Sequence, residues 1–179
     1  MQHSIYKGGQ DSEIVQLFAQ AFTDTEGKKE GALIGNLVHT LLKITPTQDI
    51  RVFTTSKEEK IVGGVIFSKM RFNQSTVNAW LLSPAAVVPS VQGTGVGQGL
   101  IQHAHQFLKN EGAQVLITYG DIRFYSKVGY KPISEQVIPA PLRLSYPEGW
   151  IAQSLEGKEI NPIKGKSFCA EALNNSVYW

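Results

Sequence analysis

The sequence predicts an α+β protein, with αβα layers in which helices flank a mixed β-sheet, within a single domain of residues 1–179. Three observations favour this fold class. Two amphipathic helical patterns come first in the chain, long β-type runs follow them, and a strand–helix–strand segment lies at the centre. We expect the core within about residues 1–135, and an irregular segment over 136–179 that completes the domain.

The N-terminal part of the chain is expected to hold one strand and two helices. Residues 4–7 are typical of a short strand, and Asp11 is a suitable N-cap for the first helix. The polar stretch 23–31 predicts a loop. Beyond it, the second helix carries apolar residues at helical spacing: Leu33, Ile34, Leu37, Val38, Leu41 and Leu42.

β-Type segments dominate the middle of the chain. "IRVFTTS" and "IVGGVIFSKMRF" flank the charged sequence "KEEK" and predict a hairpin, and residues 77–88 form a third run. A helix is expected from near Gly95 to Gly112, then a strand over 115–118 and a short helix over 121–128 that Gly129 would cap. In the C-terminal segment, strands are expected around Val137 and over 150–155.

Composition and charge exclude several classes of function. The formal charge is only +2 and the basic residues are scattered, so no nucleic-acid partner is expected. No apolar stretch reaches the roughly 18 residues of a membrane span, and no secretory signal is visible, so we expect a cytoplasmic protein without membrane contact. The single cysteine forms no internal disulfide. His103 and His105 lie on different helix faces, and no metal site is expected.

The start of the central helix is unusually rich in glycine. Gly93, Gly95, Gly97 and Gly99 fall within seven residues, although each glycine inside a helix costs about 1 kcal/mol relative to alanine. A strand end, a glycine turn and a helix N-terminus together expose backbone N–H groups at the positive end of the helix dipole, where a phosphate can approach closely. The alternative is a tight turn that allows close packing of the helix on the sheet.

Two familiar phosphate-binding motifs do not fit this stretch. The only "GKS", at residues 165–167, has Ile160 where a Walker A loop needs its first glycine. The Rossmann pattern G-x-G-x-x-G fails as well, because Gln98 or Leu100 occupies the third glycine position. A nucleotide-binding protein of either class is therefore disfavoured.

A third pattern does fit, and it points to a family. Gln92, Gly95 and Gly97 form Q-x-x-G-x-G directly after "VVP". This resembles the acetyl-CoA-binding motif [QR]-x-x-G-x-[GA] of the GNAT superfamily of N-acetyltransferases. "LLSPAAVVPSVQGTGVGQGLI" is similar to the "LGPLAVxPxxQGxGIGxxLI" run of one bacterial subgroup, and "TYGDIRFYSKVGYKPI" is similar to its "LGDPxYYxRFGFxP".

The resemblance implies a GNAT fold and an acetyl-CoA site. In that fold the fourth and fifth strands splay apart to admit the cofactor, and Pro84 is consistent with such a parting because proline cannot donate to a strand ladder. The cofactor pantetheine would follow the strand edge at Ala85, Ala86 and Val87. Its pyrophosphate would lie against Gln92 and the backbone of Gly93, Thr94, Gly95, Val96, Gly97 and Gln98.

The resemblance also implies a proton donor. Tyr125 matches the family tyrosine that protonates the CoA sulfur, Phe124 would pack beside the cofactor, and Asp121 would cap the short helix or touch the cofactor. Core packing is the alternative for both aromatic residues. Thr118 stands where many members have asparagine, and the central strand has no carboxylate to act as a general base. Glu26 and Glu30 are the remaining candidates for that role, with water and a solvated surface position as the alternatives.

The leading hypothesis is an N-acetyltransferase that moves the acetyl group of acetyl-CoA to an amine by direct attack, with Tyr125 as general acid. The acceptor would be a small-molecule amine or a protein or peptide amine, and residues 136–179 would complete the acceptor side. The alternative is a non-catalytic GNAT-fold module that binds an acyl-CoA as a sensor or interaction domain. Either a monomer or a homodimer fits the sequence.

Overall fold

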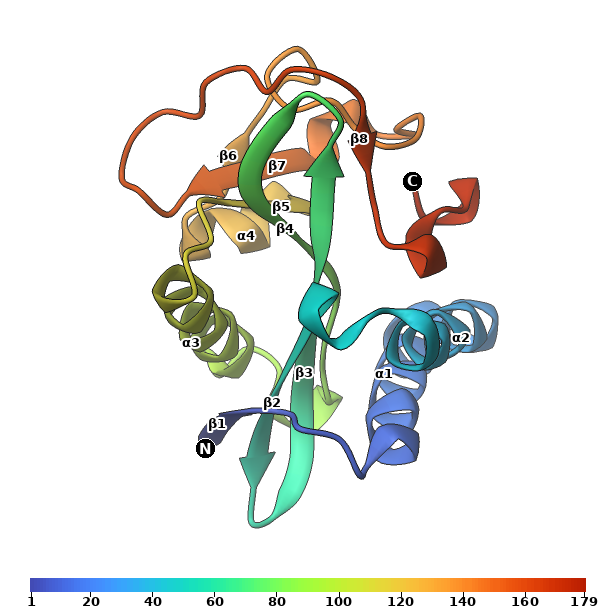
Figure 1. Cartoon of the computed structure of the whole chain (residues 1–179). Helices are drawn as coiled ribbons and strands as arrows, with labels where there is room; N and C mark the ends of the chain where they lie inside the picture. The colour runs from blue at the N-terminus through green and yellow to red at the C-terminus, as the bar shows by residue number, and fades with distance from the viewer. The chain divides into compact units, whose positions relative to one another are not determined.

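The computed structural model describes residues 1–179 (Figure 1). The helices are α1 (Asp11–Glu26), α2 (Lys28–Ile44), α3 (Val96–Asn110) and α4 (Ile122–Tyr125). The strands are β1 (Gln2–Ile5), β2 (Ile50–Lys57), β3 (Lys60–Phe72), β4 (Ser75–Val87), β5 (Val115–Tyr119), β6 (Lys131–Pro132), β7 (Trp150–Ser154) and β8 (Ser167–Phe168).

The strands form a mixed sheet of eight members. Their hydrogen-bonded order is β1-β2-β3-β4-β5-β7-β6, and β8 pairs with β3. β4 and β5 are parallel, in a register that runs from Ala79 opposite Val115 to Leu82 opposite Thr118. The pairs β1–β2, β5–β7, β6–β7 and β3–β8 are antiparallel. The predicted α+β class, with helices that flank a mixed sheet, is confirmed.

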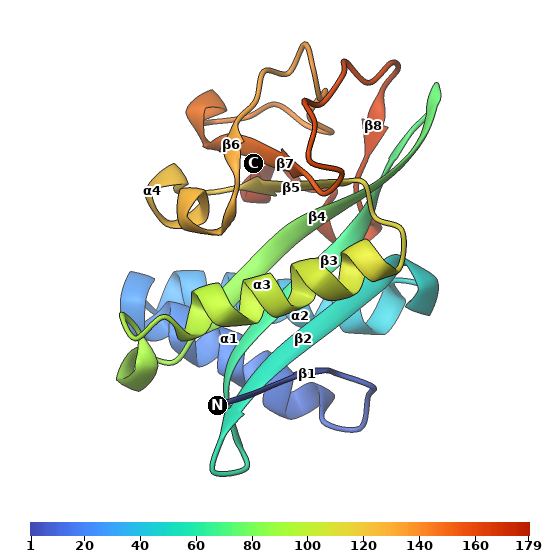
Figure 2. The ribbon, with the colours of Figure 1, turned by 90° about the vertical axis from the view of Figure 1, so that its left-hand side faces the viewer.

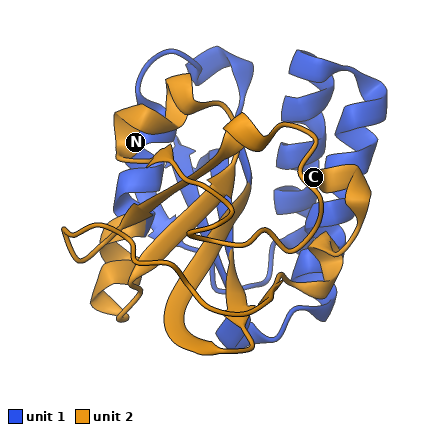
Figure 3. Cartoon of the chain, turned by 90° about the horizontal axis from the view of Figure 1, so that it is seen from above, with its two compact units in different colours: residues 1–67, 84–104 blue, residues 68–83, 105–179 orange.

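The chain divides into two compact units that alternate along the sequence (Figure 3). The first unit comprises residues 1–67 and 84–104, and the second comprises residues 68–83 and 105–179. The chain passes from one unit to the other within β3, near the end of β4 and within α3. No irregular linker therefore separates them.

In the first unit, α1 and α2 lie side by side (Figure 1) and pack through small residues. A Cβ atom added at Gly35 would come within 2.9 Å of the Ala19 Cβ, and one at Gly31 would come within 2.6 Å of the Ala19 carbonyl oxygen. These two glycines therefore bring the helix backbones closer together than any larger residue would allow. The apolar faces meet around Ile14, Phe18, Val38 and Leu41, all of which are fully buried.

The joint between α1 and α2 differs from the prediction in two respects. Residues 23–31 are not a loop, because α1 continues to Glu26 and α2 begins at Lys28, with only Gly27 between them at φ +100°. The Gly27 N–H donates to the Thr23 carbonyl, and the Gly31 N–H donates to the Gly27 carbonyl. Polar residues in this stretch lie on exposed helix ends, which explains why their composition was misleading.

Asp11 is the first residue of α1 and not its N-cap, a position that Gln10 occupies without a side-chain hydrogen bond. The Asp11 carboxylate instead accepts a hydrogen bond from the Tyr6 hydroxyl at 2.5 Å. A negative charge in the first helical turn is still favourable, because it faces the positive end of the helix dipole. The predicted helix is thus confirmed while its predicted cap is wrong.

The predicted hairpin is confirmed, and β2 and β3 run side by side into its turn (Figure 2). Glu58 and Glu59 form this turn with φ values of +50° and +65°. Two consecutive residues with positive φ are typical of the tight turns whose twist matches that of the paired strands.

In the second unit, the sheet around β5 is buried on both faces. Leu116 and Ile117 are fully buried, as expected for a central strand with neighbours on each side. β7 confirms the strand predicted over 150–155. The strand predicted around Val137 is wrong: the Val137 N–H closes a turn by donating to the Ser134 carbonyl, and the apolar signal belongs to Ile138, which this turn buries completely.

Candidate active site

The predicted site residues fall into two groups, one in each compact unit. The first unit brings together the end of β4 and the start of α3, with Ala85, Ala86, Val87, Gln92, Gly93, Thr94, Gly95, Val96, Gly97 and Gln98. The second unit holds Asp121, Phe124 and Tyr125 at α4.

The turn before α3 depends on two glycines in the left-handed region. Gly93 has φ +72° and Gly95 has φ +83°, values that side chains with a Cβ rarely adopt. The Thr94 hydroxyl closes the turn by donating to the Val91 carbonyl at 2.6 Å. A Cβ atom added at Gly93 or Gly95 would meet no other atom within 4 Å, so the turn is open on the outside.

This turn leaves a run of backbone donors without a partner. The Gln92 N–H donates to the Pro89 carbonyl and the Gly99 N–H donates to the Gly95 carbonyl, whereas the N–H groups from Gly93 to Gln98 make no hydrogen bond inside the protein. They lie at the N-terminus of a 15-residue helix whose dipole is positive there. Such an array, open to the outside, fits an anion of the size and charge of a pyrophosphate.

Gly99 serves a different purpose from Gly93 and Gly95. A Cβ atom added to it would lie 3.1 Å from the His3 Nε2, so its absence makes room for the His3 side chain from β1. Close packing therefore explains Gly99, whereas Gly93 and Gly95 form an open turn.

In the last residues of β4, the backbone groups of one strand edge face β3 and those of the other edge face away from it. The Val88 N–H donates to the Val62 carbonyl, and the Ala86 carbonyl faces Gly63. Because backbone groups alternate along a strand, those of Ala85 and Val87 point to the opposite edge. The Gln92 side chain reaches this edge and donates to the Val87 carbonyl at 2.8 Å, a contact that the motif letters alone did not reveal.

In the second unit, Tyr125 is held among aromatic rings. The ring of Phe124 meets it edge to face at 5.0 Å between centroids, and the ring of Tyr130 does so at 5.5 Å. Its ring also packs on Gly120, where an added Cβ would come within 2.7 Å of the Tyr125 Cε2. Burial raises the pKa of the Tyr125 hydroxyl to about 12, with a smaller opposing effect from the Thr118 hydroxyl beside it.

Thr118 stabilises the strand pair next to Tyr125. Its hydroxyl donates to the Leu82 carbonyl at 2.8 Å, at the last registered pair of β4 and β5. Thr118 therefore links β4 to β5 beside the Tyr125 hydroxyl.

A buried polar pair lies behind these rings. The Tyr130 hydroxyl is 3.2 Å from the His105 Nε2, and both residues are buried. Burial lowers the pKa of His105 to about 4, so its imidazole is neutral at pH 7. The motif that this stretch resembles has phenylalanine at the position of Tyr130, and no pattern in the sequence indicates the contact of Tyr130 with a histidine on α3.

Asp121 takes the capping role that was one of its two predicted roles. Its carboxylate accepts from the Arg123 backbone N–H at 2.9 Å and forms an ion pair with the Arg123 guanidinium at 2.7 Å. The side-chain and backbone hydrogen bonds from Arg123 lower the pKa of Asp121. Among the candidate bases, Glu26 is exposed at the end of α1 and Glu30 is half-buried in the first turn of α2.

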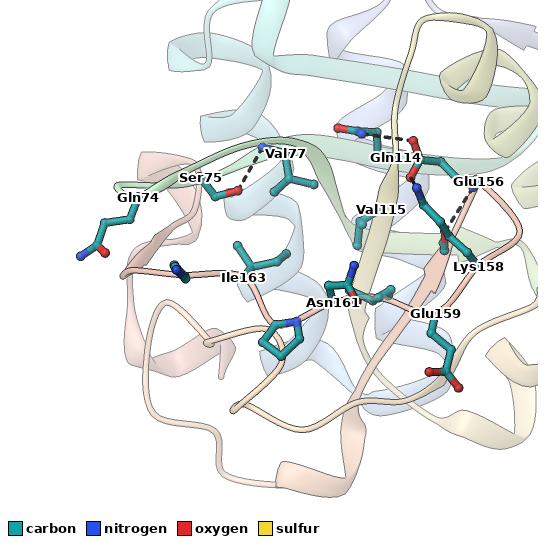
Figure 4. Close-up of a pocket in the computed structure, with 14 residues that line it drawn as sticks. Gln74, Ser75, Val77, Gln114, Val115, Glu156, Lys158, Glu159, Asn161 and Ile163 are labelled. Carbon is teal, nitrogen blue, oxygen red and sulfur yellow. Dashed lines mark hydrogen bonds and ion pairs between the residues drawn. The ribbon is translucent and has the colours of Figure 1, made fainter.

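Two hollows of the second unit lie on opposite ends of β5. One, of about 340 Å³, is lined by residues at the carboxyl end of β5 and just before β7, and we call it the Tyr119 pocket: Tyr119, Gly120, Asp121, Ile122, Tyr146, Glu148 and Gly149. The other, of about 400 Å³, lies at the start of β5 beneath residues 156–164 (Figure 4). Three of its polar side chains pair with one another, because Gln114 donates to Glu156 and Glu156 binds Lys158.

No three His, Cys, Asp or Glu side chains gather as a metal-binding group. No helix has both the length and the apolar character needed to cross a membrane.

Comparison with known proteins agrees with this architecture. Residues 48–132 match the family described as Acetyltransferase (GNAT) domain. The chain is 28% identical over 141 residues to an uncharacterized N-acetyltransferase, YjhQ, of Escherichia coli strain K12, which covers 76% of this chain and 77% of the relative.

Solved structures show the same fold over nearly the whole chain. The GNAT family N-acetyltransferase YhbS from Escherichia coli, solved in complex with CoA, has a TM-score of 0.82 at 18% identity, covering 98% of this chain and 92% of that chain. A GNAT family acetyltransferase from Brucella melitensis, in complex with acetyl-CoA, has a TM-score of 0.68 at 20% identity, with 97% and 99% covered. Sequence and fold thus agree in their similarity: residues 48–132 match the GNAT acetyltransferase family, and nearly the whole chain has the fold of solved GNAT acetyltransferases.

Proposed function

We propose that the protein transfers the acetyl group of acetyl-CoA to the nitrogen of an amine. The observation that carries this proposal is the run of six unpartnered backbone N–H groups, from Gly93 to Gln98, at the N-terminus of α3. Relatives with this fold have been solved with CoA and with acetyl-CoA, which supports the same ligand here. When bound, acetyl-CoA supplies an acetyl group activated as a thioester.

The end of β4 supports the proposal as a second binding element. The N–H of Val87 and the N–H and carbonyl of Ala85 point away from β3, so an extended amide-bearing arm can add to this edge as a further strand does. The carbonyl of Val87 is already engaged by Gln92. These contacts would orient the pantetheine arm, and an N–H on this edge would stabilise the oxyanion of the tetrahedral intermediate.

Tyr125 is the proposed proton donor. The amine nitrogen forms a bond to the acetyl carbon, the carbon–sulfur bond breaks, the amine loses one proton to water, and the departing thiolate takes a proton from the Tyr125 hydroxyl. A phenol with a pKa of about 12 is protonated at neutral pH, so the proton is available. Bulk solvent then returns a proton to the tyrosine.

The cofactor site is tested by adding a negative charge at Gly97. Gly97→Glu directs a carboxylate to the place proposed for the pyrophosphate, and the affinity for CoA should fall by roughly 100-fold because like charges oppose one another. Gly97→Ala is the matched control, since it adds a methyl group without charge and should keep most of the affinity. Isothermal titration with CoA measures both. A folded Gly97→Glu variant with the parental affinity would show that the site is elsewhere.

The catalytic role is tested by Tyr125→Phe. This substitution keeps the ring that packs on Gly120 and removes only the hydroxyl, so the fold and CoA affinity should remain. General acid catalysis contributes about 100- to 10,000-fold, and kcat should fall within that range. The loss should be smaller with an acetyl thioester of a more acidic thiol, because that thiolate needs less help to depart. An unchanged kcat, where chemistry limits turnover, would remove Tyr125 from the mechanism.

A further inference from the structure

The walls of the Tyr119 pocket are mainly apolar and aromatic. The Tyr119 ring stacks on Trp179 at 6.0 Å between centroids, and its hydroxyl accepts from the Tyr146 backbone N–H at 2.6 Å. These contacts hold the Tyr119 ring in place as one wall of the pocket. The Tyr146 side chain is 67% exposed and the pocket is lined further by Ile122 and by two glycines that carry no side chain.

The charge that lines this pocket is negative. None of the lining residues is basic, and two of them, Asp121 and Glu148, are acidic. Arg123 neutralises Asp121 through its ion pair. Glu148 is exposed and has no ion-pair or hydrogen-bond partner in the structure. The pocket therefore presents one uncompensated carboxylate beside an apolar surface.

The pocket also lies next to the proposed proton donor. Gly120 lines it, and the Tyr125 ring packs on that same glycine. Both features follow the carboxyl end of β5, just beyond the parallel pair of Leu82 and Thr118. The pocket and the Tyr125 ring thus have Gly120 as a common neighbour.

We propose that the Tyr119 pocket binds the acetyl acceptor, and that it selects a primary alkylamine with an apolar or aromatic body and no carboxylate. Glu148 attracts the ammonium form of the amine, which loses one proton to water to become the neutral nucleophile before it attacks, and the rings of Tyr119 and Tyr146 contact its apolar part. A carboxylate on the acceptor would face Glu148 without any basic residue to compensate it. This inference rests on the proposed acetyl transfer, whose acceptor it specifies.

The test compares two amines that differ only by a carboxylate, 2-phenylethylamine and phenylalanine. With saturating acetyl-CoA, release of CoA should give a kcat/KM for 2-phenylethylamine at least about ten-fold above that for phenylalanine. Glu148→Gln should raise the KM for 2-phenylethylamine by roughly three- to ten-fold, leave kcat within about two-fold, and reduce the discrimination against phenylalanine. Raising the ionic strength should increase KM for the parent protein and not for this variant, since salt screens an exposed charge.

Two further variants make the test specific. Glu135→Gln removes an exposed glutamate of the same unit that does not line the pocket, and it should change no constant. Tyr146→Ala removes a mostly exposed ring, so the fold should remain, and it should raise KM for 2-phenylethylamine more than for butylamine. Titration calorimetry of 2-phenylethylamine in the presence of CoA measures acceptor binding without turnover.

The outcomes separate this inference from the proposed function. If phenylalanine is acetylated as well as 2-phenylethylamine, or if Glu148→Gln leaves KM unchanged, the acceptor assignment is wrong although acetyl transfer stands. If no amine of any class releases CoA, the transfer is wrong. A calorimetric affinity for 2-phenylethylamine that depends on Glu148 would then still support selection by the pocket, and one that does not would overturn it.

Discussion

The pH dependence of stability should include the effect of the buried His105, beside that of His3, whose pKa is also lowered by burial. Burial lowers the pKa of His105 to about 4, against 6.5 for an exposed imidazole. Between these two values the unfolded chain binds a proton that the folded protein does not, so the free energy of unfolding falls as the pH decreases from 6.5 to 4. The stabilising contribution is fully present above pH 6.5, and its loss at pH 4 is about 3 kcal/mol.

Urea unfolding at pH 7, 5.5 and 4.5 measures this effect, and His105→Gln is its control. Glutamine keeps an amide that can bond the Tyr130 hydroxyl but does not titrate, so the variant should lose less stability over the same interval. The low-pKa carboxylates Asp121 and Glu156 are exposed, and they are unchanged in the variant. Equal pH slopes for the parent and the variant would show that His105 is not the group responsible.

At the scale of single residues, the sequence correctly predicted the capping residues whose role depends only on the local backbone conformation. Gly129 caps the α4 region in the left-handed conformation at φ +98°, and Asp121 caps its start, both as expected. Asp11 is not the cap because it is already the first residue of α1, where its carboxylate accepts a hydrogen bond from the Tyr6 hydroxyl. Glu148 and Tyr146 gave no signal, because the pocket that they line is formed only when distant segments meet.

At the scale of elements, hydrophobic periodicity predicted the long helices and strands correctly. The polar composition of residues 23–31, by contrast, predicted the ends of α1 and α2 at the wrong positions. The polar residues 23–31 suggested a loop, yet a helix boundary needs only one residue with the right conformation, which Gly27 provides. Strands of two residues, β6 and β8, are too short to have a detectable period. The run of glycines before α3 shows the same limit of sequence-based prediction. The sequence alone does not distinguish the open turn at Gly93 from the packing contact at Gly99.

The whole molecule is expected to unfold in a single cooperative transition. Three regular elements, β3, β4 and α3, each contain residues of both compact units, so neither unit can lose these elements without disrupting the other. All three tryptophans, Trp80, Trp150 and Trp179, belong to the second unit. Tryptophan fluorescence therefore reports on that unit, while far-ultraviolet circular dichroism reports on both.

A substitution in the first unit tests this coupling. Gly31→Val places a side chain against the Ala19 carbonyl, where even a Cβ would come within 2.6 Å, and the strain should lower the free energy of unfolding by about 2 kcal/mol. Asn36→Ala, at an exposed position of the same helix, should change it by less than about 0.5 kcal/mol. In urea, the fluorescence and dichroism midpoints of Gly31→Val should shift together. If the dichroism midpoint falls and the fluorescence midpoint does not, the two units unfold independently, and the continuity of the three elements does not couple them.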